Sequence, residues 1–154
     1  MYGLIKESHA YDIAHDVVKV LGGDYNVTRL LLEIAQQETQ MGQYRDQTHY
    51  AAGTGLHQFD ELPFYDIIKR TRQKHIDKVL EAYDVDMREV EWRELEHSPL
   101  LSFIACRLFW LLNPETVGDT IEKRALQWKK YYNTNLGKGH TSEYIENAKK
   151  VCVI

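Results

Sequence analysis

The stretch Leu30-Leu-Leu-Glu-Ile-Ala-Gln-Gln-Glu38-Thr39, with Gly53-Thr-Gly-Leu-His-Gln58-Phe-Asp60 downstream of it, decides the fold that we predict for this chain. One stripe of a helix would carry the apolar residues Val27, Leu30, Leu31, Ile34 and Ala35. The next position on that stripe is Glu38. A carboxyl group therefore stands where the pattern calls for an apolar residue, in the last turn of the helix.

This placement favours an uncharged Glu38. Apolar surroundings and the negative end of the helix dipole both disfavour the carboxylate, so both raise its pKa. A carboxylic acid that keeps its proton near neutral pH can act as a proton donor. The alternative is a glutamate at a frayed helix end that points into water.

Composition is that of an ordinary globular protein. The chain has 154 residues, 44% of them hydrophobic and 27% charged, which predicts one domain covering residues 1–154. The net charge of −4 gives no basic footprint for nucleic acid, so we expect no nucleic-acid partner. The two cysteines, Cys106 and Cys152, form neither a disulfide framework nor a metal-binding spacing, which favours a reducing compartment.

No membrane or export signal is expected. The N-terminal residues lack a charged leader followed by an apolar run, so we expect synthesis in the cytoplasm without a signal peptide. The longest apolar run, Leu100 to Leu112, is interrupted by Ser102 and Arg107. It is too short to cross a bilayer and predicts a buried helix, and hence no membrane insertion.

Periodicity and capping residues predict about six helices and little strand. We place them from a Ser8 cap to Leu21, from Asn26 or Thr28 to Glu38, from Asp60 to Tyr83, from Ser98 to Leu112, from Thr116 or Asp119 to Tyr132, and from Thr141 or Ser142 to Val151. Between Thr39 and Phe59 no helical period holds, and glycines recur. That length favours a functional loop or a small hairpin.

Two polar clusters carry alternative interpretations. His9, Asp12, His15 and Asp16 could hold a metal, but a solvated helix face explains them better, and we expect neither metal nor cofactor. The helix after Asp60 has a basic face that could bind an anionic partner or simply face solvent. Its residues are Lys69, Arg70, Arg72, Lys74 and Lys78.

Three motifs in order resemble the lysozyme-like lytic transglycosylases. Gln37-Glu38-Thr39 is similar to that family's Glu-Ser motif, and Gly53-Thr-Gly-Leu-His-Gln58 to its Gly-Leu-Met-Gln motif. Trp128-Lys-Lys-Tyr-Tyr132-Asn133 resembles its late Tyr-Asn motif, and the following residues resemble phage-encoded members. The resemblance runs from about Val27 to Ala148, with only helical character matching in the middle. It implies a mainly α, lysozyme-like (α+β) domain with a small loop or hairpin insertion after the catalytic helix.

The resemblance also implies an activity. Family members cleave the β-1,4 bond between N-acetylmuramic acid and N-acetylglucosamine in peptidoglycan and leave a 1,6-anhydro end. Glu38 matches their catalytic acid and base. The residues matching substrate-binding positions are Thr39, Gly53, Thr54, Gly55, Leu56, Gln58, Tyr132 and Asn133.

The sequence departs from the family pattern at two positions. His57 stands where the family has Met, which we interpret as a titratable ring beside the cleft, and Thr54 stands where it commonly has Ala. Instead of binding substrate, Gly53 and Gly55 could simply form a turn, and Tyr132 could be a core residue.

A hydrolytic reaction is a second possibility. Asp46, or Asp60 further on, could pair with Glu38 and activate water on the far face of the sugar, as in an inverting lysozyme. Asp46 with Thr48 or Thr54 would imitate the Glu, Asp and Thr set of phage hydrolases. The Gly-Leu-x-Gln block favours the transglycosylase.

Two non-enzymatic hypotheses for the function also remain. The chain could be a saccharide-binding or structural module on the same fold, or a helical interaction domain that uses the basic face. For the enzyme we expect a monomer whose partner is the glycan strand of peptidoglycan, reached through holin-dependent release or carriage in a virion.

Overall fold

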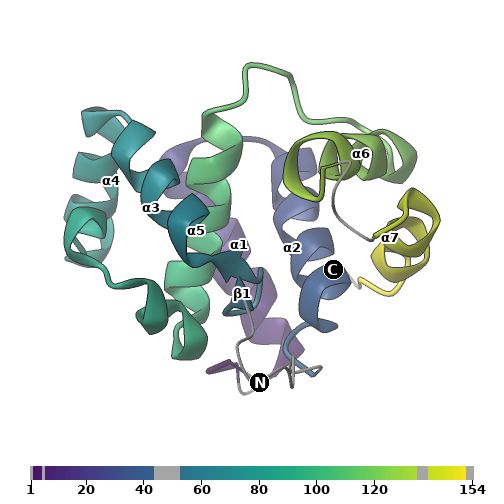
Figure 1. Cartoon of the computed structure of the whole chain (residues 1–154), viewed down its shortest axis with the longest axis horizontal. Coiled ribbons are helices and arrows are strands. Elements are labelled where there is room, and N and C mark those ends of the chain that lie inside the picture. Colours follow the sequence, from purple (N-terminus) through teal and green to yellow (C-terminus); the bar gives the residue numbers. More distant parts are fainter. Residues whose placement is uncertain (1, 5, 44–52, 135–138, 152–154) are drawn as a thin grey trace.

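Helices dominate the computed structural model, which describes residues 2–4, 6–43, 53–134 and 139–151 (Figure 1). Its α-helices are α1 (Glu7–Leu21), α2 (Tyr25–Thr39), α3 (Glu61–Arg70), α4 (Gln73–Tyr83), α5 (Pro99–Leu111), α6 (Ile121–Gln127) and α7 (Thr141–Ala148). Two 3-10 helices, η1 (Met87–Glu89) and η2 (Trp92–His97), precede α5, and a π-helical turn, η3 (Trp128–Tyr132), continues α6.

The strands form one small antiparallel hairpin, β1 (Gly53–Thr54) with β2 (Phe59–Asp60). Gly53 pairs with Asp60 and Thr54 with Phe59. The prediction of a mainly helical chain with a small hairpin after the helix of Glu38 is confirmed. The predicted Asp46 and Thr48 lie outside the described residues, as does Cys152.

The apolar helix α5 is the centre of the core. It is buried on nearly all sides and packs against α1, α2 and α3. In Figure 1 it runs between α3 and α4 on one side and α6 and α7 on the other. Ser98 caps it, because its hydroxyl accepts a hydrogen bond from Leu101 N at 3.2 Å, and Pro99 follows as the first helical residue, as predicted.

The two polar residues inside this apolar run have specific partners. Arg107 donates from Nε to the carbonyl of Gly22 at 2.9 Å, between α1 and α2. Ser102 is wholly buried and bonds to His57 of the hairpin. Each side chain therefore fixes a neighbouring element against α5, since a buried polar group must find a partner.

The prediction of one helix from Asp60 to Tyr83 is wrong, because Thr71 and Arg72 are extended and separate α3 from α4. The Thr71 hydroxyl donates to the carbonyl of Ile67 at 2.7 Å, which favours a helix end. In α4 the apolar side chain of Leu80 is 44% exposed.

Several predicted capping residues are also wrong, since more than one polar residue stood near each helix start. Asp24 caps α2 by accepting from Val27 N at 3.1 Å, and Thr120 caps α6 by accepting from Lys123 N at 3.1 Å. Lys6 and His140 precede α1 and α7 without a side-chain cap. The wrong candidates are Ser8, Asn26 or Thr28, Thr116 or Asp119, and Thr141 or Ser142.

Within the described ranges, no helix has the length and apolar character needed to span a membrane. These residues also contain no group of three or more His, Cys, Asp or Glu arranged to hold a metal. The four polar residues of the α1 cluster, His9, Asp12, His15 and Asp16, are all exposed.

A buried carboxylate joins α2 to the C-terminal helices. Glu33 is wholly buried, and its Oε1 accepts hydrogen bonds from Arg124 Nε and from the Tyr144 hydroxyl, both at 2.8 Å. Its Oε2 accepts from Arg124 Nη2 at 2.9 Å and from Arg29 Nε at 3.0 Å. One carboxylate thus faces two guanidinium groups.

The arginines extend this network to the backbone. Arg29 donates to the carbonyls of Ala148 and Val151, each at 3.2 Å, and Arg124 donates to that of Gly118 at 3.1 Å. The network therefore fixes α6, α7 and the segment after α7 relative to α2, the helix that carries Glu38.

We predict that Glu33→Gln lowers the free energy of unfolding by about 3–5 kcal/mol, because it leaves the buried guanidinium group of Arg124 and the partly buried one of Arg29 without a counterion. Urea denaturation followed by circular dichroism measures the change. Glu81→Gln, at an exposed position of α4, is the control and should stay within about 0.5 kcal/mol of the wild type. Equal effects of the two substitutions would contradict the role of the network.

Candidate active site

Glu38 lies in the last turn of α2, partly buried. Its Oε1 accepts a hydrogen bond of 3.3 Å from the indole Nε1 of Trp128, in the π-helical turn. The indole itself is 1% exposed and packs against the ring of Tyr144 at 5.3 Å between centroids. A rigid donor from the C-terminal part of the chain therefore holds one oxygen of Glu38.

Burial dominates the electrostatics of this carboxyl group. The pKa of Glu38 is raised from 4.5 to about 7: burial raises it most, the Trp128 hydrogen bond lowers it, and the negative charge of Asp60 raises it by a smaller amount. Near neutral pH the group therefore exists in both protonation states. It can donate a proton and afterwards accept one.

Thr39 fixes the end of α2 to the hairpin. Its hydroxyl lies within hydrogen-bond distance of the carbonyls of Leu56 (2.9 Å) and Ala35 (3.1 Å), and it accepts from Gly42 N at 2.9 Å. The side chain is 1% exposed, so it positions Glu38 relative to the hairpin and is closed to a ligand.

The turn after α2 is strained as well as bonded. Gln40 and Met41 have positive φ values of 49° and 55°, which non-glycine residues seldom adopt. Met41 is 1% exposed, so its packing helps to hold this conformation. The backbone therefore leaves the α-helical path directly after Thr39.

The two hairpin glycines allow other parts of the chain to approach the hairpin backbone closely. A Cβ on Gly55, whose φ is 80°, would lie 2.6 Å from the carbonyl oxygen of Leu95, and one on Gly53 would lie 2.5 Å from Oε1 of Gln58. Thr54 and Leu56 are buried. Of the two predicted roles for these glycines, the structure favours the turn, and the side chains of Thr54 and Leu56 do not face an open groove.

The interpretation of His57 as a titratable ring beside the cleft is wrong. The ring is 0% exposed, and its Nε2 lies 3.0 Å from the carbonyl of Leu31, which can only accept. Nε2 therefore carries the hydrogen and Nδ1 accepts from the Ser102 hydroxyl at 2.6 Å. Burial lowers the pKa of His57 to about 4, so the ring is neutral and joins the hairpin to α2 and α5.

Gln58 bonds to the hairpin and the N-terminal segment. Its Nε2 donates to the carbonyl of Gly55 at 2.9 Å and to the Tyr2 hydroxyl at 3.4 Å. Its backbone is left-handed, with a φ of 53°. The residue is partly exposed, and these bonds direct its NH₂ group into the turn and toward Tyr2.

Tyr132 connects the π-helical turn to the hairpin. Its hydroxyl donates to the carbonyl of His57 at 2.5 Å, and its ring contacts Phe59 edge-on at 5.9 Å. Burial raises the pKa of Tyr132 most, and the negative charges of Glu38 and Asp60 add to this shift, so all three residues lie within electrostatic range of one another. Asn133 lies at the end of the turn, where its Oδ1 accepts from Lys129 Nζ at 2.9 Å.

The structure therefore brings Glu38, the hairpin and Tyr132 together, as the sequence motifs predicted. Sequence reasoning missed Trp128 as a neighbour of Glu38, whereas it considered Asp60 as a second carboxylate beside this residue. Trp128 is the first residue of the late motif and carries a donor on a large apolar ring, and that combination could have identified it. No protein-family model, curated protein sequence or solved structure matches this chain.

We predict that Thr39→Val lowers the free energy of unfolding by about 1–3 kcal/mol, because it leaves the Leu56 carbonyl and the Gly42 N–H without their hydroxyl partner. Thr39→Ser keeps the hydroxyl and should cost about 1 kcal/mol or less, mainly through one lost methyl group. Chemical denaturation of both variants makes the comparison. A serine variant as unstable as the valine variant would show that the hydroxyl is not what holds this junction.

A second prediction follows from the raised pKa of Glu38. Between pH 4.5 and about 7 the folded chain retains a proton that the unfolded chain releases, so this residue lowers stability as the pH rises through that window. Glu38→Gln should therefore match the wild type near pH 4 and exceed its stability near pH 8 by about 1–3 kcal/mol. Thermal melts at both pH values test this, and a constant difference between the proteins would contradict the raised pKa.

Proposed function

We propose that this chain is a peptidoglycan-cleaving enzyme of the lytic transglycosylase type on a lysozyme-like fold, with Glu38 as general acid and base. The single observation that supports it most is the pKa of about 7 of Glu38, beside a hairpin built from the Gly-Leu-x-Gln block. A glycosidic oxygen needs a proton before its bond breaks, and a carboxylic acid that remains protonated near pH 7 can supply it.

The proposed reaction uses Glu38 twice. Protonated Glu38 donates to the bridging oxygen between N-acetylmuramic acid and N-acetylglucosamine as an oxocarbenium-like centre develops at C1 of the muramic acid. The resulting carboxylate then removes the proton of the C6 hydroxyl. The C6 oxygen bonds to C1, a 1,6-anhydro ring forms and the acid is restored. Trp128 Nε1 stabilises the intermediate carboxylate by its hydrogen bond.

The remaining site residues have supporting roles in this proposal. Six of them hold the hairpin against the end of α2: Thr39, Gly53, Thr54, Gly55, Leu56 and Tyr132. The other two, Gln58 and Asn133, are partly exposed and would contact the glycan strand. The enzyme would act on the cell wall after release through lysis machinery or from a virion.

An inverting hydrolase is the second candidate, and one observation favours it. Asp60 is exposed, and its charge acts on Glu38, so two carboxyl groups lie within electrostatic range of each other. Asp60 would activate a water molecule on the opposite face of the sugar and would thus take the role considered for Asp46.

We predict that Glu38→Gln abolishes release of muropeptides from purified peptidoglycan, because the amide cannot donate the proton. Mass spectrometry of the wild-type products should find 1,6-anhydro ends, which are one water lighter than reducing ends. The wild-type rate should fall as the pH rises through about 7, where Glu38 loses its proton. Glu81→Gln is the control for charge loss at a remote exposed position and should keep full activity.

Asp60→Asn separates the two candidates. In a transglycosylase this variant remains active, and its decline in rate moves to lower pH because a charge that raised the pKa of Glu38 is gone. In a hydrolase it is as inactive as Glu38→Gln, and the wild-type products carry reducing ends. Binding of murein oligomers without turnover by the wild type would instead indicate a saccharide-binding module.

A further inference from the structure

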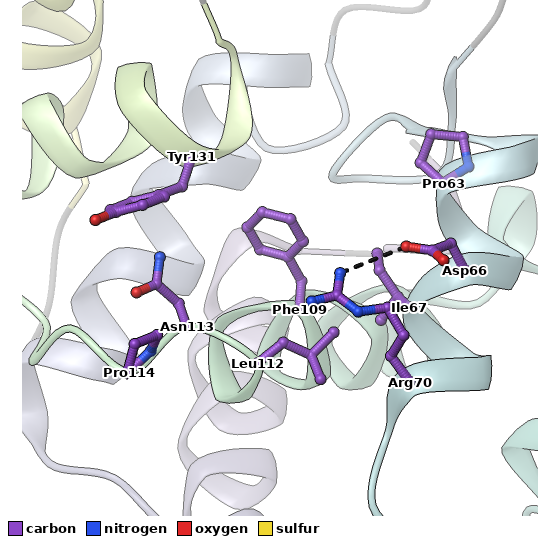
Figure 2. Close-up of a pocket in the computed structure, with 9 residues that line it drawn as sticks. All are labelled: Pro63, Asp66, Ile67, Arg70, Phe109, Leu112, Asn113, Pro114 and Tyr131. Carbon is purple, nitrogen blue, oxygen red and sulfur yellow. Dashed lines mark hydrogen bonds and ion pairs between the residues drawn. The ribbon is translucent and has the colours of Figure 1, made fainter.

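A pocket of about 470 Å³ lies between α3 and the C-terminal end of α5 (Figure 2). Phe109 of α5 and Leu112, the residue that follows this helix, form its apolar floor. Asp66 and Arg70 of α3 stand on one side, and Tyr131 with Asn113 on the other. The pocket therefore combines an apolar base with charged and amide groups at its rim.

This pocket adjoins the candidate active site. The ring of Phe109 meets that of Tyr132 edge-on, with 5.1 Å between centroids, so one aromatic layer separates the pocket floor from the tyrosine that bonds to the hairpin. The other wall, α3, begins immediately after Asp60. The pocket is thus joined to the candidate site through the contact between Phe109 and Tyr132 and through the start of α3.

The two charged groups at the rim, Asp66 and Arg70, form only a weak ion pair with each other. Asp66 and Arg70 approach to 3.4 Å, and both side chains are 59% exposed. Exposed pairs of this kind contribute little to stability, so a ligand can replace the contact at small cost. The rim then offers a carboxylate for a cation and a guanidinium for an anion, on adjacent turns of one helix.

Asn113 adds a donor on the opposite side. Its Oδ1 accepts from Glu115 N at 2.9 Å, which leaves its NH₂ group for other partners. Figure 2 shows this group pointing toward the ring of Tyr131, on the pocket side. A peptide carbonyl is a suitable acceptor for it.

We propose that this pocket binds the peptide branch of the glycan substrate, a short peptide that carries both an ammonium and a carboxylate group. This inference rests on the proposed function. In peptidoglycan the peptide is attached to the muramic acid, the sugar whose glycosidic bond is broken, so it must leave the groove close to Glu38. Its ammonium would pair with Asp66, its carboxylate with Arg70, and its alanine methyl groups would lie on Leu112 and Phe109.

The paired charges favour this ligand over two others. A neutral sugar has no ion to exchange for the contact between Asp66 and Arg70, so only the amide and the apolar floor would recognise it. A phosphate-rich polymer would bring negative charge against Asp66. A zwitterionic peptide satisfies both side chains at once.

The test compares peptidoglycan strands that keep their peptides with strands from which an amidase has removed them. The wild type should cleave the first about tenfold faster, and Asp66→Asn and Arg70→Gln should each remove most of that preference while leaving the rate on bare strands unchanged. Lys69→Gln, at an exposed position of α3 that does not line the pocket, is the matched control and should keep the preference. Equal preference in all four proteins would overturn the proposal.

A binding measurement keeps the pocket testable if no strand is cleaved. The free tetrapeptide of peptidoglycan is titrated into the whole chain by NMR, beside the same peptide with its amines acetylated and its carboxyl groups amidated. Binding of the charged peptide alone, weakened about tenfold by Asp66→Asn or Arg70→Gln, supports the pocket even where the proposed enzyme activity fails. Cleavage of both strands with no peptide binding overturns the pocket and leaves the proposed function standing.

Discussion

The contact between one buried carboxylate and two arginines holds the C-terminal part of the candidate site against α2. Glu33 stands five residues before Glu38 on α2, and its bonds to Arg29, Arg124 and Tyr144 hold α6 and α7 against that helix. The π-helical turn that follows α6 then brings Trp128 to the carboxyl group of Glu38. Since buried charges of this kind tolerate no missing partner, the C-terminal helices have one position relative to α2.

A second set of contacts fixes the hairpin of β1 and β2 against α2. The hydroxyl groups of Thr39 and Tyr132 bond to backbone carbonyls of the hairpin turn, those of Leu56 and His57. The ring of His57 bonds to the carbonyl of Leu31 in α2. The carboxyl group of Glu38 is thus held between two rigid units, one built on Glu33 and one on the hairpin. That enclosure removes water from the carboxyl group and raises its pKa, which is the property the proposed chemistry requires.

Local patterns in the sequence were sufficient to predict much of this arrangement. The stripe that ends in Glu38, the Ser98 cap with Pro99 and the glycine-rich block all depend on neighbours within a few residues, and the predicted helix, cap and hairpin are found there. The break at Thr71 was missed because the apolar stripe continues across it. Its cause is one hydroxyl bonded to a carbonyl four residues earlier, which periodicity does not reveal.

Long-range pairings could not be predicted in the same way. Trp128 is 90 residues from Glu38, Tyr132 is 75 residues from His57, and Arg124 is 91 residues from Glu33. Nothing in a single sequence says which of several polar residues will meet across such distances, so His57 was placed beside the cleft. Polar residues inside apolar runs, such as Ser102 and Arg107, were the available signal that specific partners exist.

The π-helical turn also restricts how this chain can vary. The backbone N–H of Asn133 bonds to the carbonyl of Trp128, five residues earlier, at 2.8 Å, so this turn holds one residue more than an α-helical turn. That extra residue lets Trp128 face α7 and Glu38 while Tyr132 faces the hairpin and α5. Loss of a single amino acid here would restore ordinary helical winding and turn one of the two aromatic rings away from its partner. Surface loops can lengthen or shorten over generations, but this five-residue segment can keep both contacts only at its present length.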